Sequence, residues 1–251
     1  MAQQRIARLL STREIHADTR LLRFATEDAL GFTGGQYIIV NTGIAIGEGK
    51  IAKRAYSLLS SDTDQSHFEI AVRRIHNGPG SNYMLNLTEG SELAFSGPWG
   101  KLLPRVPDSA NITPTLVMAT DTGITAALGL VNSAIFAPSL AATSIFWLSE
   151  SDKYFLPESF VRERIPTGCK HFEVVRIPAD TDGRESWLSS HRNAFLKHVL
   201  SEQPSTMFLS GDGFLLSDFR DAMRQSLPYP PEIFIETFFH HQAVKTATAA
   251  V

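Results

Sequence analysis

The sequence Arg54-Ala55-Tyr56-Ser57 lies inside a strand-like run, Ile51–Leu59, and places a cation, an aromatic ring and a hydroxyl within four residues. Side chains two residues apart in a strand share a face, so Arg54 and Tyr56 point the same way. A ring beside a guanidinium suits a planar ligand that carries phosphate, because the ring stacks and the guanidinium pairs with oxygen. Ser57 falls on the opposite face by alternation, so a shared role requires the strand to end or twist there. Four residues alone also fit an ordinary half-buried strand with one exposed arginine.

The first hundred residues around this tetrapeptide read as short strands separated by turns. Apolar residues alternate with polar or small ones along 68–73, the period-two pattern of a half-buried strand. Glycine-rich turns at 34–35, 43–49 and 77–80 punctuate the runs. Six short strands in this length predict a small antiparallel barrel or sandwich. The expected strands are Arg5–Ser11, Thr19–Thr26, Gln36–Asn41, Ile51–Leu59, His67–Ile75 and Glu92–Ser96.

The proline-rich segment Pro104–Pro114 is the predicted boundary, and beyond it strands alternate with helices. Such alternation implies a parallel sheet with right-handed crossovers. We therefore predict two domains, residues 1–107 and residues 108–251. The expected strands are Thr115–Thr120, Thr143–Leu148, His171–Ile177, Thr206–Leu209 and Glu232–Glu236. The expected helices run from Ile124 to about Phe136, from Pro157 onward, and over Trp187–Leu200 and Leu215–Gln225.

Composition narrows the classes of function. The chain has 251 residues, of which 43% are hydrophobic and 20% charged, and a formal net charge of −3. The sequence has no long basic run, so nucleic acid is not an expected partner. No apolar stretch approaches the ~18 residues of a membrane helix. The start at Met1 runs directly into strand-like sequence, so no signal peptide is expected. The single cysteine, Cys169, excludes a disulfide framework and any Cys-rich metal or iron–sulfur site within this chain, and makes a cytoplasmic setting the default expectation.

A glycine turn after the fifth strand is a candidate phosphate site. Gly78-Pro79-Gly80-Ser81 runs into a short helix. Free backbone N–H groups at a helix start bind phosphate, and glycine lets the backbone come close. Arg73 and Arg74 add positive charge beside it, although a plain turn explains these residues equally well.

Two turns of the second half are candidate nucleotide contacts. Thr120-Asp121-Thr122-Gly123-Ile124-Thr125 joins the first strand of the parallel sheet to its helix, and Ser210-Gly211-Asp212-Gly213 follows the fourth strand. In a doubly wound sheet such turns lie at the carboxyl ends of the strands, where nucleotides bind. Two of them on one edge predict a ligand crevice.

The last strand ends in Glu236-Thr237-Phe238-Phe239, which can be a strand end with an apolar anchor or part of a site. His240-His241 follows, but consecutive side chains diverge in direction and the sequence offers no carboxylate or cysteine partner nearby. We therefore expect no metal site.

These pieces, in this order, resemble the ferredoxin–NADP reductase superfamily, and the resemblance covers nearly the whole chain. Arg54-Ala55-Tyr56-Ser57 matches the family's R-x-Y-S/T flavin signature, and Gly34-Gly35-Gln36-Tyr37 resembles the turn that precedes it. Gly78-Pro79-Gly80-Ser81 is similar to the G-x-x-S pyrophosphate motif, and Gly97-Pro98-Trp99-Gly100 to the G-P-x-G turn that ends the barrel. The resemblance implies a six-stranded antiparallel Greek-key β-barrel that binds FAD, followed by an α/β domain with a five-stranded parallel sheet that binds NAD(P).

The resemblance also implies roles for individual residues. Arg54 would hold the flavin pyrophosphate with Gly78, Gly80 and Ser81, Tyr56 would stack on the flavin ring, and Ser57 would lie near the atom that receives the hydride. Glu236 would be the family's C-terminal acid. The implied catalytic residues are Ser57, Glu236 and Ser210. The other implied cofactor contacts are Ala55, Val72, Arg73, Thr122, Gly123, Ile124, Thr125, Glu150, Gly211, Asp212, Gly213 and Phe238.

Three residues depart from the family pattern. Asp121 and Ala126 alter the nucleotide turn, and Ser210 stands where many members have cysteine. After the second strand, Glu150 would repel a 2′-phosphate and hydrogen-bond a ribose hydroxyl, which favours NADH over NADPH unless Arg176 or Arg184 supplies a phosphate contact.

The expected activity is hydride transfer from NADH or NADPH to FAD, followed by single-electron transfer to a separate acceptor such as a ferredoxin or an oxygenase component. A separate acceptor is needed because this chain lacks the four cysteines of a fused [2Fe–2S] domain. One alternative is a reductase of free flavin or other small molecules. Another is a flavin-holding scaffold or sensor subunit without nicotinamide chemistry, which the departures at 121, 126 and 210 motivate.

Overall fold

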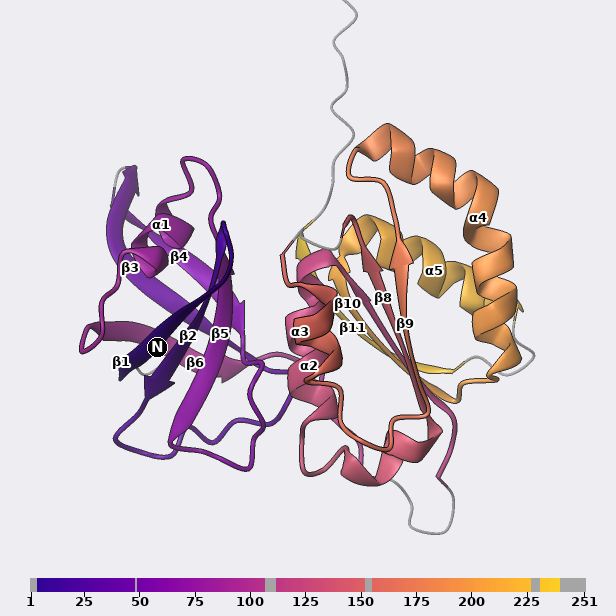
Figure 1. Cartoon of the computed structure of the whole chain (residues 1–251), viewed down its shortest axis with the longest axis horizontal. Helices are drawn as coiled ribbons and strands as arrows, with labels where there is room; N and C mark the ends of the chain where they lie inside the picture. The colour runs from indigo at the N-terminus through magenta and orange to yellow at the C-terminus, as the bar shows by residue number, and fades with distance from the viewer. Residues whose placement is uncertain (1–3, 48, 107–111, 152–154, 227–230, 240–251) are drawn as a thin grey trace, which may run out of the picture.

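The chain forms two β-sheets that lie side by side, each built from its own half of the sequence (Figure 1). The computed structural model describes residues 4–47, 49–106, 112–151, 155–226 and 231–239. The predicted boundary between residues 107 and 108, and the pair His240-His241, lie outside these described residues.

The first half is the six-stranded antiparallel barrel sheet, in the order β4-β3-β6-β1-β2-β5. The last strand, β6, returns between β1 and β3, which is a Greek-key crossing. Its elements are β1 (Arg5–His16), β2 (Thr19–Ala25), β3 (Tyr37–Gly47), β4 (Lys50–Ser57), β5 (His67–Arg73), α1 (Pro79–Leu85) and β6 (Glu92–Trp99).

Alternation along the strands builds the barrel core. Phe68, Ile70 and Val72 of β5 are buried in it, as the period-two pattern predicts. Ala71, on the opposite face of β5, packs instead against the second half of the chain. This strand therefore serves both the barrel core and the interface.

Several barrel strands are longer than their apolar segments indicate. The ladder of β1 with β2 continues to the pair His16–Thr19, beyond the predicted end at Ser11. The glycine segment after Asn41 is part of the β3–β4 hairpin rather than a free loop, because Ala45 pairs with Ile51. The predicted turn at Gly97–Trp99 lies within β6. Backbone pairing extends strands through polar and glycine residues that carry no apolar signal.

The second half is a five-stranded parallel sheet in the order β11-β10-β7-β8-β9. Of the three inner strands, β7 and β8 are buried along their whole length, as strands covered on both faces are. Its strands are β7 (Thr115–Thr120), β8 (Thr143–Ser149), β9 (His171–Arg176), β10 (Thr206–Asp212) and β11 (Glu232–Phe239). Its helices are η1 (Asp121–Gly123), α2 (Ile124–Val131), η2 (Ala137–Ala142), α3 (Glu158–Arg162), α4 (Thr181–Ser201) and α5 (Gly213–Ser226).

Helices cover both faces of this sheet. α2 and α3 lie on the face toward the barrel, and α4 and α5 lie on the far face (Figure 1). The helix predicted to reach Phe136 ends at Val131, and the helix predicted from Trp187 begins six residues earlier, after the Asp180 carboxylate accepts the Gly183 N–H. Strand order changes direction at β7, so the switch point where such folds bind ligands lies between β7 and β10.

Glycines bring the two halves into close contact. A Cβ at Gly129 of α2 would lie 2.1 Å from the Leu58 carbonyl oxygen, and one at Gly34 would lie 2.1 Å from the Gly129 carbonyl oxygen. The Asp62 carboxylate reinforces this contact, because it accepts hydrogen bonds from the Ser133 hydroxyl and the Ala134 N–H. None of the helices in the described residues combines the length and apolar character needed to cross a membrane.

Candidate active site

A cavity of about 470 Å³ lies between the two halves of the chain. It is walled by β4, β5 and the start of α1 on one side, and by η1, α2 and β11 on the other. β4 and β5 are the two end strands of the barrel sheet, so the cavity opens where that sheet has no further strand. The lining residues are Tyr37, Arg54, Ala55, Tyr56, Ser57, Ala71, Arg73, Ile75, Gly78, Gly80, Ser81, Thr122, Thr125, Phe155, Glu236, Thr237 and Phe238.

All four residues of the tetrapeptide line this cavity. β4 ends at Ser57, which satisfies the condition that the strand must end there for Tyr56 and Ser57 to face one ligand. The Arg54 Nη1 donates to the Lys53 carbonyl oxygen at 2.7 Å, and the rest of the arginine side chain is exposed to solvent. The edge strand thus offers its charge, ring and hydroxyl to one space.

Arg54 lies directly against the first turn of α1. A Cβ at Gly80 would be 2.4 Å from the Arg54 Cγ, so glycine is needed for this approach. The Ser81 hydroxyl accepts the Ile75 N–H at 3.0 Å and fixes the turn before the helix. The predicted residues Gly78, Gly80 and Ser81 are therefore brought beside the guanidinium, which places backbone donors and a cation side by side.

The two tyrosines of the cavity stay protonated over the physiological range. Burial raises the pKa of Tyr56 to about 12, against a smaller opposing effect of Arg54. Burial and then the charge of Glu236 raise the pKa of Tyr37. A neutral ring at Tyr56 presents a face suited to stacking on a flat ligand.

The β5 wall differs from the prediction. Arg73 lines the cavity, but the Val72 side chain is buried in the barrel core and does not. Strand alternation gives the cavity positions to Ala71 and Arg73 instead. Ala71 was missed because a small residue on a strand carries no chemical signal.

The α/β half contributes hydroxyls, an acid and aromatic side chains. Four of the predicted site residues line the cavity from this side, namely Thr122, Thr125, Glu236 and Phe238. Phe155, which the sequence did not single out, lines it as well. The Glu236 Oε2 accepts the Lys101 N–H at 3.0 Å, which ties the end of β11 to the segment after the barrel. Gly123 and Ile124 do not line the cavity. The Ile124 side chain is buried in the core between the halves.

The second predicted turn lies behind the cavity wall. Ser210, Gly211, Asp212 and Gly213 are buried and are not among the lining residues. The Ser210 hydroxyl donates to the Gly123 carbonyl oxygen at 3.0 Å, and the Asp212 N–H donates to the Thr120 hydroxyl at 2.6 Å. These residues hold the two turns of the switch point together.

Both glycines of this contact are required by packing. A Cβ at Gly123 would lie 2.1 Å from the Ser210 carbonyl oxygen, and one at Gly211 would lie 2.3 Å from the Thr120 hydroxyl. Gly211 also has a φ of 126°, which L side chains rarely adopt. The close approach of β10 to the end of β7 and to η1 therefore accounts for both.

Arg184 is the residue that organises this edge of the sheet. It is 1% exposed, and its guanidinium pairs with Asp121 at 2.8 Å, Glu150 at 2.9 Å and Asp212 at 3.1 Å. Its Nε donates to the Pro178 carbonyl oxygen at 3.0 Å. One side chain thus joins the segments that follow β7, β8 and β9 and the end of β10.

This cluster changes the roles of two predicted cofactor contacts. Asp212 is fully buried against Arg184 and does not line the cavity. One carboxylate oxygen of Glu150 also accepts a hydrogen bond from Arg184. Burial and the charge of Asp121 raise the pKa of Glu150, and Arg184 opposes them. Arg176, the other candidate phosphate contact, pairs with Glu158 at 2.7 Å.

The signal that could have located Arg184 is the unusual residue Asp121. It has a φ of 48° and is fully buried. A buried carboxylate requires a cation or hydrogen-bond donors, so Asp121 itself calls for an arginine from another element. The sequence does not say which arginine.

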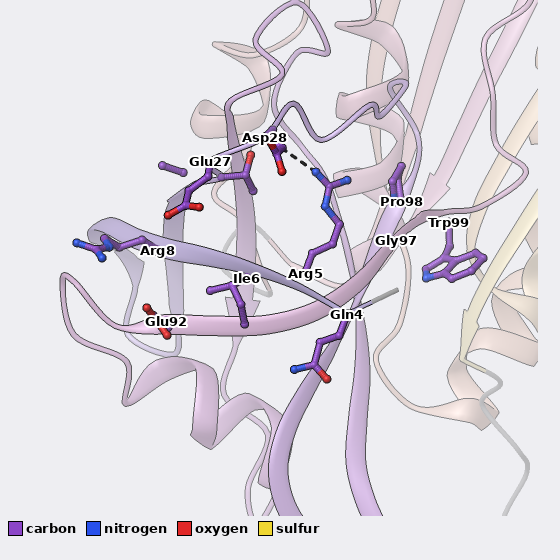
Figure 2. A pocket seen from close by; sticks show the side chains of 12 residues that line it. Gln4, Arg5, Ile6, Arg8, Glu27, Asp28, Glu92, Gly97, Pro98 and Trp99 are labelled. Carbon is purple, nitrogen blue, oxygen red and sulfur yellow. Dashed lines mark hydrogen bonds between the residues drawn. The ribbon is translucent and has the colours of Figure 1, made fainter. Parts of the chain in front are cut away.

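A second and wider hollow of about 950 Å³ lies on the outer face of the barrel (Figure 2). Arg5 points across it and donates to the backbone carbonyl oxygens of Leu30 at 2.7 Å and Ala29 at 2.8 Å. None of the predicted site residues is among the described residues that line it. Those predicted site residues that line either hollow therefore line the cavity between the halves.

Comparison with known proteins identifies the family to which this chain belongs. The family model described as "Oxidoreductase FAD-binding domain" matches residues 6–103, which contain the barrel sheet except for its first residue, Arg5. Ferredoxin–NADP reductase B of Sorangium cellulosum is 35% identical over 209 residues, which cover 82% of this chain and 81% of that protein. The chain belongs to the ferredoxin–NADP reductase superfamily of FAD-dependent NAD(P)H oxidoreductases.

Other relatives match a smaller part or show the fold alone. NADH-cytochrome b5 reductase 1 of Cryptococcus neoformans is 35% identical over 135 residues, 52% of this chain and 44% of that protein. A ferredoxin NADP+ reductase from Neisseria gonorrhoeae, solved with bound FAD and NADP, has a TM-score of 0.73 at 16% identity and covers 95% of this chain and all of its own. Amycolatopsis cytochrome P450 reductase GcoB has a TM-score of 0.71 at 21% identity, over 95% of this chain and 71% of its own.

The cavity fits the cofactor that the family uses. Its wall combines a neutral tyrosine ring, an exposed guanidinium and a glycine cradle that a Cβ would fill. A flavin dinucleotide needs a flat apolar contact for its ring and positive or N–H donors for its pyrophosphate. Both kinds of group are present on adjacent elements.

Proposed function

We propose that this chain takes a hydride from NADH at the cavity between its halves and delivers electrons one at a time to a separate iron–sulfur protein or oxygenase component. The observation that carries the proposal is that Tyr56 and Ser57 from the barrel and Glu236 and Phe238 from β11 line one cavity. Bound FAD supplies the ring that accepts two electrons together and returns them singly.

In this proposal the chain's own residues bind and orient. Arg54, with the first N–H groups of α1, holds the pyrophosphate, and Tyr56 supports the ring. Ser57 offers its hydroxyl where the hydride arrives. Glu236, fixed by the Lys101 N–H, places an acceptor for a proton at the far wall of the same cavity. Phe238 and Phe155 keep that wall apolar.

The first test is spectroscopic. Purified protein should be yellow, and NADH should bleach it under anaerobic conditions. Protein that is colourless and gains no flavin spectrum with added FAD contradicts the proposal.

We propose NADH rather than NADPH because Glu150 lies at the nucleotide edge. Among the described residues, the carboxylates of Asp121, Glu150 and Asp212 gather around the Arg184 guanidinium, and the charge of Arg73 also acts on Glu150. A 2′-phosphate would add two further negative charges near Glu150. Arg184 is buried and is bonded to these carboxylates, so it does not offer the phosphate contact that would reverse the preference.

Glu150→Gln tests this choice. The amide keeps an oxygen for Arg184 but removes the charge, so the ratio of kcat/KM for NADPH to that for NADH should rise roughly threefold, the scale of a partly exposed charge interaction. Glu163→Gln, which removes an exposed carboxylate at the C-terminal end of α3 and outside the cavity lining, is the matched control. An unchanged ratio in Glu150→Gln removes this residue from cofactor choice.

The proposed acceptor is a separate, acidic redox protein. The described lining of the cavity carries two basic side chains, Arg54 and Arg73, and one acidic side chain, Glu236. Among relatives, the aromatic O-demethylase reductase subunit of an Amycolatopsis species is 28% identical over 131 residues. Turnover with diffusible acceptors but with no iron–sulfur protein would favour a small-molecule reductase instead. The single cysteine, Cys169, fits the cytoplasmic setting that we propose.

The Arg184 cluster motivates a second candidate, a flavin-holding subunit without nicotinamide chemistry. It ties together the turns that a nucleotide would have to approach. Rapid mixing with NADH and with NADPH separates the candidates, because only the reductase shows flavin reduction. No reduction by either nucleotide supports the second candidate.

A further inference from the structure

Two histidines and a glutamate converge on the face of the parallel sheet that lies away from the barrel. His171 and Glu173 are two residues apart on β9 and share a face, and His198 projects from α4. The Glu173 Oε2 lies 3.2 Å from the His171 Nε2 and 3.4 Å from the His198 Nε2. The three donor atoms lie within 4.8 Å of one another.

We propose that His171, Glu173 and His198 form a site for a divalent transition-metal ion, of which Zn²⁺ is the best match. Two imidazoles and one carboxylate are a ligand set that Zn²⁺ accepts, with a fourth position left to water. Zn–N and Zn–O bonds of about 2.0–2.2 Å in a tetrahedron place neighbouring ligand atoms roughly 3.4 Å apart. The two nitrogen-to-oxygen separations already have this length.

The surroundings hold the imidazoles in place. The Phe146 ring packs against both, with centroid distances of 5.6 Å to His171 and 5.5 Å to His198. The neighbouring Lys170 forms its ion pair with Glu202, so that cation is engaged outside the three ligands. Fixed rings reduce the side-chain entropy that metal binding would otherwise cost.

All three side chains are about half exposed, at 43% for His171, 42% for Glu173 and 50% for His198. An ion can therefore enter and leave without unfolding of the sheet. Because the ligands come from β9 and α4, a bound ion cross-links the edge strand to the helix that covers it. The site is separate from the cavity, to which none of the three contributes.

Calorimetric titration of Zn²⁺ into the untagged, chelator-treated, FAD-loaded full chain tests the proposal. The wild type should bind one equivalent at this site. His198→Ala should weaken binding by at least about tenfold, since even outer-shell partners of metal ligands contribute about 10–100-fold. His191→Ala is the matched control, because it removes an exposed histidine two turns earlier on the same helix and should leave binding unchanged.

Thermal unfolding gives a second readout that does not depend on activity. Zn²⁺ should raise the unfolding midpoint of the wild type and of His191→Ala, but not of His171→Ala or Glu173→Gln. Glu173→Gln keeps the side-chain shape, so its loss of response cannot be a folding defect if its metal-free midpoint is unchanged. The variant His240→Ala/His241→Ala should respond like the wild type. Wild-type affinity in His198→Ala, or an equal loss in His191→Ala, overturns the site.

Discussion

Ser57 occupies the point where β4 ends and the cavity begins, and it is half-buried there. In the proposed site, Tyr56 provides the ring and Arg54 the charge that hold the cofactor. We expect a hydroxyl at a strand end to orient the reacting groups more than it strengthens FAD binding. Its removal should therefore lower the rate of flavin reduction more than the affinity for FAD.

Ser57→Ala should slow flavin reduction by NADH about tenfold, the scale of one hydrogen bond worth roughly 1.4 kcal/mol, while changing the FAD dissociation constant less. Anaerobic rapid mixing gives the reduction rate, and titration of the apoprotein gives the FAD affinity. Ser96→Ala, on β6 and outside the cavity lining, is the control. Equal losses of rate and affinity would assign Ser57 a structural role.

Tyr56 makes stability depend on alkaline pH. Its pKa is about 12 in the folded chain, whereas an unfolded tyrosine has a pKa of about 10. The unfolded state therefore loses this proton first, and the free energy of unfolding falls as pH rises from about 10 to about 12. At a pH of about 11 the wild type should have lost about 1 kcal/mol more than Tyr56→Phe, relative to a pH of about 9.

Urea unfolding of both proteins at the two pH values measures this difference. The other tyrosines, including Tyr37, are common to both proteins, so their titration cancels. Identical pH dependence would mean that Tyr56 ionises in the folded chain as readily as in the unfolded chain.

At the residue scale, the sequence predicts a shared position best where the residues are neighbours in the chain. Arg54 to Ser57 are consecutive on one strand, so their common environment follows from one element. Arg184 could not be placed in the same way, because its partners Asp121, Glu150 and Asp212 come from separate parts of the chain. Only the folded sheet brings them together.

At the scale of elements, the carboxyl edge of the parallel sheet is held by buried charge. Removing Arg184 would leave buried carboxylates without this cation. The free-energy cost of such an uncompensated buried charge is much larger than the net stabilisation that an intact buried ion pair provides. Arg184→Met should lower the free energy of unfolding by about 3–5 kcal/mol. The end of β10 and the turn after β7 should both lose protection from hydrogen exchange.

Asp121→Gly provides the matching half of a double-mutant cycle. Glycine tolerates the φ of 48° at this position and removes one of the carboxylates that Arg184 neutralises. The double variant Arg184→Met/Asp121→Gly should therefore be more stable than the sum of the single effects predicts, by about 0.5–3 kcal/mol. Strict additivity would mean that the Arg184–Asp121 contact at 2.8 Å carries no coupling.

Element ends were the least predictable part of the fold. β1 continues to His16 and β3 to Gly47 because each pairs along a neighbour, although the added stretches mix polar residues and glycines with apolar ones. α4 begins at Thr181, where the Asp180 side chain caps it, ahead of the first apolar turn. Hydrophobic periodicity reports burial, whereas backbone pairing and capping decide where an element stops.

At the scale of the whole molecule, the cavity exists only while the two halves keep their relative position, because its walls come from both. The Gly34 and Gly129 backbones meet there without side chains between them. Asp62 adds the polar part of the contact. Its Oδ2 accepts the Gly34 N–H at 3.0 Å and the Ser133 hydroxyl at 2.5 Å, and its Oδ1 accepts the Ala134 N–H at 2.9 Å.

Asp62→Ala removes all three hydrogen bonds, and we expect it to lower the free energy of unfolding by roughly 2–3 kcal/mol. Because the loss falls on the contact between halves, the reduction of bound flavin by NADH should also slow. FAD affinity, which we propose depends on β4 and α1, should change little. Unfolding followed by flavin release and by far-ultraviolet circular dichroism should coincide in the wild type and separate in the variant. Asp64→Ala is the control, since that carboxylate lies two residues away and its hydrogen bonds within the described part of the chain go to Ser66 and His67 of the first half. Coincident transitions with an unchanged reduction rate in Asp62→Ala would mean that the glycine contact alone fixes the halves.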